Sequence, residues 1–178
     1  MTPDDIIAYW REAGPDHWFN ADPALDVDVR RRFEDVWRNA RDGKLVDWER
    51  SPTGMLALIL VLDQFPRNMF RGQPDAFATD SMALALAKRM IENGDAAKID
   101  PDLRQFVYMP LMHSENLDDQ IQCVALFDAF GNPDNKKYAE IHADIIRRFG
   151  RFPHRNVILG RQTTDQEAAF LNSGGFAG

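Results

Sequence analysis

SPTGMLALILVLDQF, residues 51–65, is the stretch that decides the fold class of this chain. Its run MLALILVL, residues 55–62, is apolar on every side, so a buried strand and a buried helix both fit its periodicity. The leucine-rich composition, and the continuation of the run into a polar pair at 63–64, favour a helix inside the core. Pro52 is a residue typical of the first turn of such a helix. The stretch therefore predicts one central helix that is buried on all sides.

Helical spacing also recurs outside this central stretch. Apolar residues three or four positions apart mark three further segments, whose members are Val29, Phe33, Val36, Trp37 and Ala40, then Leu117, Ile121, Val124 and Ala125, and finally Tyr138, Ile141, Ile145 and Phe149. The sequence lacks the alternating apolar pattern of strand pairs joined by hairpin turns. We therefore expect an all-α fold of about seven or eight antiparallel helices joined by short loops.

The length and composition are those of an ordinary globular protein. The chain has 178 residues, of which 44% are apolar and 28% are charged, so it can bury a sizeable core. We find no linker rich in glycine, proline and serine between two halves. The sequence predicts a single domain over residues 1–171, followed by a loose C-terminal tail over residues 172–178.

The charge balance limits the partners. The formal net charge is -7, which argues against binding to nucleic acids or anionic membranes, because both need a basic surface. The single cysteine, Cys123, can form neither an internal disulfide nor a cysteine metal cluster, which fits a reducing compartment. The N-terminus lacks the pattern of a signal peptide, and the apolar run at 55–62 is too short to cross a bilayer. We expect a cytoplasmic protein that has no membrane or nucleic-acid partner.

Positive charge is nevertheless concentrated in RFGRFPHRNVILGR, residues 148–161, which holds four arginines and one histidine but no carboxylate. A similar segment, QFPRNMFRG, occupies residues 64–72. A guanidinium group suits carboxylates and phosphates, and it also stacks on aromatic rings. Two interpretations follow. The arginines bind an anionic ligand in a pocket walled by Phe149 and Phe152, or they pair with the chain's own carboxylates and helix ends.

Three long stretches carry a family resemblance, namely LDQFPRNMFRGQPDAFATD (62–80), FVYMPLMHSENLDDQ (106–120) and IIRRFGRFPHRNVILGR (145–161). They resemble an uncharacterised bacterial family described as a domain of unknown function, and the resemblance covers nearly the whole chain. It implies an all-helical fold similar to that of tetratricopeptide-repeat proteins, although the Trp-Leu-Gly-Tyr signature of those repeats is missing here. The resemblance implies no reaction, substrate or catalytic residue.

Our first functional hypothesis is a binding protein with a polar pocket for an anionic small molecule or an acidic peptide. The predicted ligand-binding residues are Arg67, Arg71, His113, Arg151, His154, Arg155 and Asn156. Asp63 and Glu115 are expected to support the pocket by holding the arginines in place. For Asp63 the spacing supports this role, because it lies one helical turn before Arg67. The oligomeric state stays open.

Two other functions stay open as well. In an enzyme such as a hydrolase, His113 and Glu115 would form the acid/base pair and the arginines would stabilise developing negative charge. Structural capping of the next helix by Ser114 or Asn116 explains the same stretch without catalysis. A helical scaffold that binds another protein is the third hypothesis. We expect no cofactor and no metal site, because glycine-rich phosphate loops, nucleophile elbows and recognised metal-ligand spacings are all missing.

Overall fold

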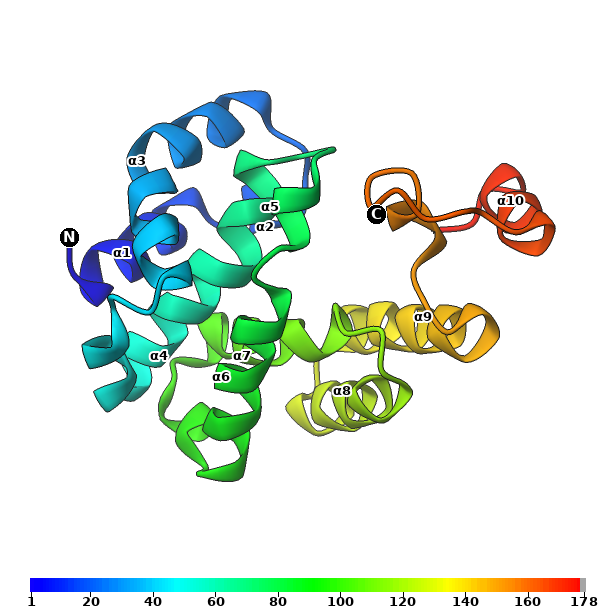
Figure 1. Cartoon of the computed structure of the whole chain (residues 1–178). Helices are drawn as coiled ribbons and strands as arrows, with labels where there is room; N and C mark the ends of the chain where they lie inside the picture. The colour runs from blue at the N-terminus through cyan, green and yellow to red at the C-terminus, as the bar shows by residue number, and fades with distance from the viewer. Residues whose placement is uncertain (177–178) are drawn as a thin grey trace. The chain divides into compact units, whose positions relative to one another are not determined.

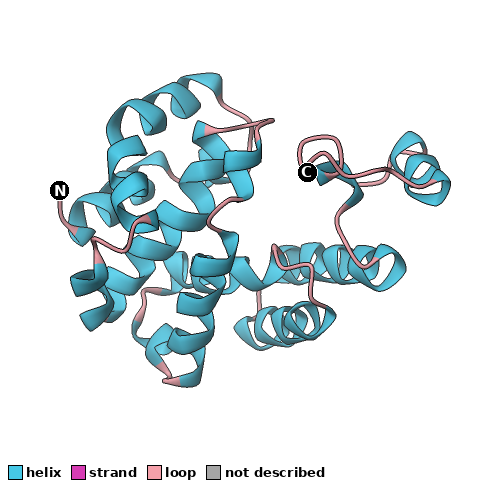
Figure 2. Ribbon diagram, viewed as in Figure 1, coloured by secondary structure: helices cyan, strands magenta, loops and turns pink. Residues whose placement is uncertain are grey.

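The computed structural model describes residues 1–176, and this part consists of helices and loops, so the all-α prediction is confirmed (Figures 1 and 2). Its α-helices are α1 (Pro3–Ala13), α2 (Pro15–Trp18), α3 (Pro23–Arg41), α4 (Pro52–Ile59), α5 (Phe65–Met69), α6 (Asp80–Glu92), α7 (Pro101–Met112), α8 (Leu117–Phe130), α9 (Pro133–Phe149) and α10 (Asp165–Asn172). Short 3-10 segments stand at Val46–Arg50, Pro74–Phe77, Asp95–Lys98 and Pro153–Arg155. Eight of these α-helices have eight or more residues, in agreement with the predicted number.

The chain divides into two compact units. The N-terminal unit contains residues 1–71 and 75–110, and the C-terminal unit contains residues 72–74 and the chain from Leu111 onward. The single domain predicted over residues 1–171 stays a prediction.

The stretch at 51–65 forms the centre of the N-terminal unit, and the prediction of a buried helix is confirmed. The Ser51 hydroxyl caps α4 by accepting a hydrogen bond from the N–H of Gly54. Every side chain in residues 55–62 is at most 4% exposed. Because α4 packs against α1, α6 and the 3-10 segment at Val46–Arg50, its sequence needs no polar face.

The helical path changes its hydrogen-bonding pattern after α4. A π-helical turn spans Leu60–Gln64, and α5 then begins at Phe65. Pro66 lies in the first turn of α5 and has no N–H to donate, and the Leu62 carbonyl four residues earlier accepts the Thr79 hydroxyl instead, at 2.6 Å. The Phe65 ring packs against Trp10 of α1 and Phe33 of α3, with ring centroids 5.5 and 4.7 Å apart respectively.

The C-terminal unit is built on the pair α8 and α9, which lie side by side (Figure 1). Asn116 and Asn132 cap their N-termini through side-chain oxygens. The turn between the helices places Gly131 at a φ of 80°, a conformation that residues with a Cβ rarely adopt. One cluster of buried residues in this unit consists of Ile145, Ile146 and Phe152, against which Ile141, Phe149, Phe170 and Phe176 pack.

The α8 helix is confirmed, but its buried face differs from the apolar repeat in the sequence. Leu117 and Ile121 are 37% and 53% exposed, whereas Gln120, Cys123 and Phe127 are buried. The Gln120 amide explains part of this difference in the buried face. It donates hydrogen bonds to the last carbonyls of α7, those of Leu111 at 3.2 Å and of Met112 at 2.7 Å. A polar residue thus takes an inward position because it satisfies a helix end.

The tail predicted over residues 172–178 is described as far as Phe176. α10 ends at Asn172, and the Phe176 ring lies 4.6 Å from the ring of His142. Residues 177–178 lie outside the described part of the chain. Within that part, every helix is too short or too polar to cross a lipid bilayer.

Candidate functional site

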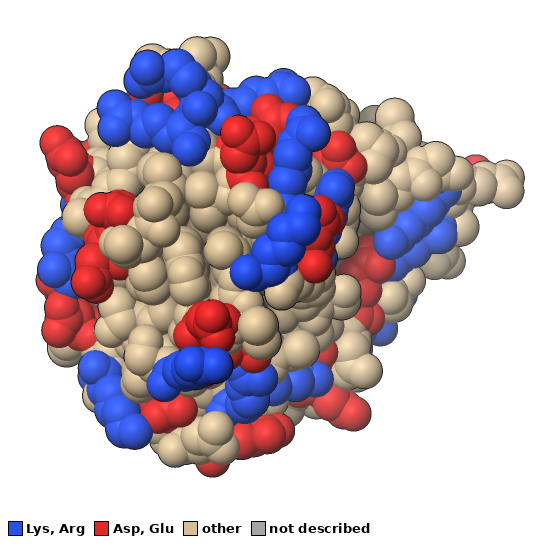
Figure 3. Space-filling model, turned by 60° about the vertical axis from the view of Figure 1, so that its left-hand side comes forward, with Lys and Arg blue, Asp and Glu red and all other residues tan. Residues whose placement is uncertain are grey.

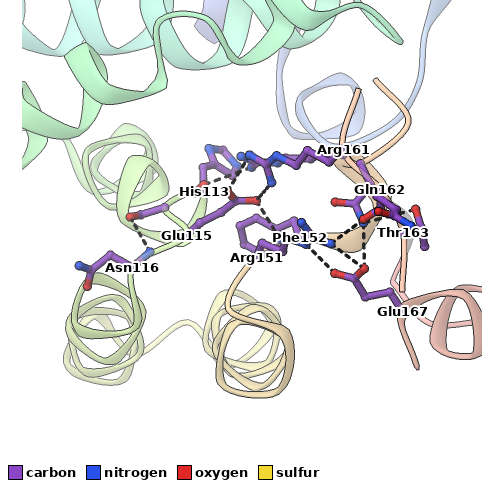
Figure 4. A network of polar contacts seen from close by, with 12 residues as sticks. His113, Glu115, Asn116, Arg151, Phe152, Arg161, Gln162, Thr163 and Glu167 are labelled. Atoms are coloured by element: carbon purple, nitrogen blue, oxygen red, sulfur yellow. Dashed lines mark hydrogen bonds and ion pairs between the residues drawn. The ribbon is translucent and has the colours of Figure 1, made fainter. Parts of the chain in front are cut away.

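A network of polar contacts joins two segments of the C-terminal unit that are distant in sequence (Figure 4). One is the turn between α7 and α8, at residues 113–116, and the other is the connection between α9 and α10, at residues 150–164. The first is a capping turn, as expected, because the Asn116 side chain accepts the N–H of Asp118 at 2.8 Å. The second is irregular because Gly150 ends α9 in a left-handed conformation and Pro153 follows.

Glu115 anchors the first half of the network. Its carboxylate accepts hydrogen bonds from both ends of the Arg161 guanidinium, at 2.8 and 2.9 Å, and from the Phe152 N–H at 2.9 Å. Burial alone would raise the pKa of Glu115, but the Arg161 and Phe152 hydrogen bonds outweigh it, so the pKa lies below its ordinary value. The carboxylate stays ionised near neutral pH and is poorly suited to donate a proton.

Glu167 anchors the second half, and it is only 2% exposed. Arg151 donates to its two oxygens at 2.6 and 2.9 Å, and Asn156 donates to one of them at 3.2 Å. The N–H of Thr164 donates to the same oxygen at 2.8 Å. Chiefly because of the Arg151 hydrogen bonds, the pKa of Glu167 falls to about 2.

Arg155 is buried between the two halves. Its Nη2 donates to the backbone carbonyl of His113 at 3.1 Å, and its guanidinium lies 4.6 Å from the centroid of the Phe152 ring. His154 and His142 also lie against Phe152, with ring centroids 5.6 and 5.5 Å away. Burial lowers the pKa of His142 to about 4, so this histidine is neutral at neutral pH.

The C-terminal unit thus gathers six residues of the predicted site, which are His113, Glu115, Arg151, His154, Arg155 and Asn156. The other three, Asp63, Arg67 and Arg71, belong to the N-terminal unit. Arg67 forms the expected pair with Asp63 at 3.4 Å, and it also binds Asp80 through two hydrogen bonds of 2.9 and 3.0 Å. Arg71 binds the Asp26 carboxylate at 2.8 and 2.9 Å. The use of these nine residues by a ligand stays a prediction.

Sequence reasoning missed two members of the network. Arg161 belongs to the arginine-rich segment, but its partnership with Glu115 spans 46 residues and has no local signal. Glu167 did have a signal, because TDQE at 164–167 fits a capping box, in which the acid reaches back to the start of its helix. In the structure, Glu167 forms this capping box and also accepts a hydrogen bond from Arg151.

Beside this network lies an open groove of about 620 Å³, lined by Arg148, Phe149, Gln166, Ala169, Phe170 and Ser173. The Arg148 guanidinium lies 4.9 Å from the Phe149 ring centroid and 5.0 Å from that of Phe170. Its Nη1 approaches Asp144 one helical turn earlier, at 3.5 Å, and Arg147 approaches the same carboxylate at 3.7 Å. These separations exceed those of good hydrogen bonds, so Arg148 keeps donors for another acceptor.

The N-terminal unit has a smaller surface cleft, of about 340 Å³, between α1, α2 and the start of α3. His17, to which no role was assigned from the sequence, binds Asp22 there at 2.9 Å. Asp28 accepts hydrogen bonds from Arg31 and from the Tyr9 hydroxyl. Figure 3 shows basic and acidic side chains adjoining one another across the face in view. The lining of this cleft holds three carboxylates, of which Asp22 is paired with His17 and Asp28 with Arg32.

Catalytic and metal chemistry receive little support from this geometry. Glu115 is engaged by Arg161, which ties down the acid of the predicted acid/base pair. In the part of the chain that the structure describes, no three side chains of the His, Cys, Asp and Glu types are placed to hold a metal ion. Burial raises the pKa of the Cys123 thiol to about 12, so it packs as an apolar group.

Comparison with known proteins finds a family model and a solved structure whose matches cover nearly the whole chain. None of the curated proteins compared with the chain matches it. A solved structure of a protein of unknown function from Agrobacterium tumefaciens matches with a TM-score of 0.92 and 42% sequence identity, covering 97% of each chain. Residues 6–175 match the model of a family described as bacterial proteins of unknown function, DUF924. The resemblance inferred from the three sequence stretches is confirmed, and the chain belongs to the DUF924 family.

Proposed function

We propose that this chain is a cytoplasmic binding protein whose C-terminal unit takes an anionic small molecule in the groove beside residues 148–149. The observation that carries the proposal is the position of Arg148. Its guanidinium stands over two aromatic rings at the wall of a groove of about 620 Å³, a size that suits a small ligand. Such a group offers a planar fork to an anion and stacks on the rings at the same time.

The neighbouring arginines have a different part in this proposal. Arg151 and Arg161 each donate two hydrogen bonds to one internal carboxylate, so an external anion would have to displace Glu167 or Glu115. Breaking a partly buried pair in this way is costly. The predicted ligand residues of this unit therefore form the frame that holds the connection between α9 and α10, and the ligand binds one helical turn before it.

The test measures thermal unfolding of the full chain in the presence of acetate, longer monocarboxylates, dicarboxylates, phosphate and an acidic peptide. A ligand at a hundred times its dissociation constant should stabilise the protein by about 2.7 kcal/mol. The shift should disappear in Arg148→Gln. Arg147→Gln is the matched control, because Arg147 lies on the same helix and approaches the same aspartate but does not line the groove.

Loss of the shift in both variants would indicate a general charge effect and would contradict a site at Arg148. Absence of any shift in the wild type would contradict anion binding itself. A shift produced by the peptide alone would replace the small molecule with a protein partner.

A further inference from the structure

We infer that the ligand of this groove is a small monocarboxylate with an apolar body, an inference that rests on the proposed function. The first argument is the charge count. Among the residues that line the groove, Arg148 is the one that carries a charge, and it is positive. The other groove residues are uncharged. One net positive charge is matched by one carboxylate.

The second argument is the placement of the apolar surface. The Phe149 and Phe170 rings lie 5.1 Å apart, and the Arg148 guanidinium stands next to both of them. A carboxylate bound to Arg148 therefore has its body beside the rings, with Ala169 on the same groove wall. Acetate would form the ion pair but leave the rings in water, whereas an aryl or alkyl chain would cover them.

The third argument concerns the polar groups that remain. Gln166 supplies an amide donor near the groove, but the Ser173 hydroxyl already donates to the Phe170 carbonyl at 2.9 Å. A phosphate dianion or a second carboxylate would thus leave one negative charge over apolar surface without a partner, which is unfavourable. The groove walls belong to α9 and α10, whose backbone groups are used within the helices, so an extended peptide would find no strand edge to pair with.

The experiment is a calorimetric titration of the full chain with phenylacetate, acetate, phenylacetamide, phenyl phosphate and a short peptide that ends in phenylalanine. Phenylacetate should bind at least about tenfold more tightly than each of the others. Its affinity should fall about tenfold or more in Arg148→Gln and stay unchanged in Arg147→Gln. Ala169→Glu places a negative charge on the exposed groove wall of α10 and should abolish binding without disturbing the core.

The outcomes separate this inference from the proposed function. Equal binding of acetate and phenylacetate, or tighter binding of phenyl phosphate, with loss in Arg148→Gln, would overturn the monocarboxylate inference and leave the anion site in place. Tighter binding of phenylacetamide than of phenylacetate would overturn both, because the charge would then contribute nothing. Preference for the peptide would replace the small ligand. If none of these probes binds the wild-type chain, the inference and the proposed function both fail.

Discussion

Two segments of the chain, at residues 64–72 and 151–161, share Phe-Pro and Arg-Asn. In each of them, an asparagine and an arginine bind one common carboxylate. In the N-terminal unit, Asn68 and Arg71 donate to the same carboxylate, that of Asp26. In the C-terminal unit, an asparagine and an arginine likewise share Glu167. In each unit, an amide and a guanidinium that share one carboxylate bind a proline-containing segment to another helix, 42 to 45 residues away at Asp26 and 11 to 16 residues away at Glu167.

The two segments differ in backbone and in burial. The first is helical, as α5, and its Arg67 pairs with Asp63, a carboxylate with no exposed surface. The second is a 3-10 turn with irregular chain around it, and its Arg155 binds a backbone carbonyl and an aromatic ring. The comparison teaches that most arginines in these motifs are architectural. A candidate ligand contact has to be sought outside the shared-carboxylate pattern, and Arg148 lies outside it.

The largest expected loss of stability comes from the arginine that pairs with Asp63, next to the first segment. Arg67→Ala leaves the buried Asp63 carboxylate without its guanidinium, and we expect a loss of about 3–5 kcal/mol in the free energy of unfolding. Chemical denaturation of both proteins measures it. Arg67→Met should lose nearly as much, because it restores packing but not charge. A loss below about 1 kcal/mol would mean that the pair is no more important than a surface ion pair.

The stability of the packing around the second segment should depend on acid pH, because the buried His142 lies against Phe152 of that segment. The pKa of His142 is about 4 in the folded chain and about 6.5 when unfolded, so the unfolded state binds more protons between these values. Stability should therefore fall by about 3 kcal/mol as the pH drops from 6.5 to 4. Glu167 contributes a further loss of stability as the pH falls from its pKa in the unfolded chain, about 4.5, toward its pKa of about 2 in the folded chain. Denaturation of the wild type and of His142→Gln across this range checks the sign, and an unchanged pH profile in the variant would contradict it.

A smaller effect compares the two asparagines directly. Asn156 is fully buried, whereas Asn68 is only partly buried. We expect Asn156→Ala to cost about 2 kcal/mol, because Glu167 loses a donor in a buried site, and Asn68→Ala to cost about 1 kcal/mol. Equal losses in parallel urea titrations would show that burial does not distinguish the two segments.

The smallest effect concerns the exposed arginine of the first segment. The Arg71 side chain is half exposed while it binds Asp26, so Arg71→Ala should cost at most about 1 kcal/mol. This cost should shrink further when the unfolding is repeated in high salt, because exposed charges are screened. A large loss of unfolding free energy that does not depend on salt would contradict this expectation and show that the Arg71–Asp26 pair behaves like a buried ion pair.

Several features of the fold could be predicted from local sequence. The apolar run at 55–62 predicted a buried helix, because a segment without a polar face has to be covered on all sides. The buried face of α8 could not be predicted in the same way. Leu117 and Ile121 form an apolar stripe, but Gln120 points inward because it meets the carbonyls at the end of α7.

The candidate site could be predicted only in part. His113, Arg151, His154, Arg155 and Asn156 were selected because their types suit anions, and the structure brings them together within one unit. The pairing of Arg161 could not be predicted, since Arg161 and Glu115 are 46 residues apart and no spacing rule joins them. Nor did the sequence distinguish Arg148 from its neighbours.

By itself, the sequence determined that the chain is helical and that two proline-containing segments carry arginines but no carboxylate. Helical periodicity and capping residues act over a few positions, and the sequence shows both directly. The tertiary structure alone decided which carboxylates hold Arg71, Arg151 and Arg161 and which arginine faces a groove. In the C-terminal unit, those choices depend on the path of the connections at 113–116 and 150–164, which brings together groups that are far apart in the chain.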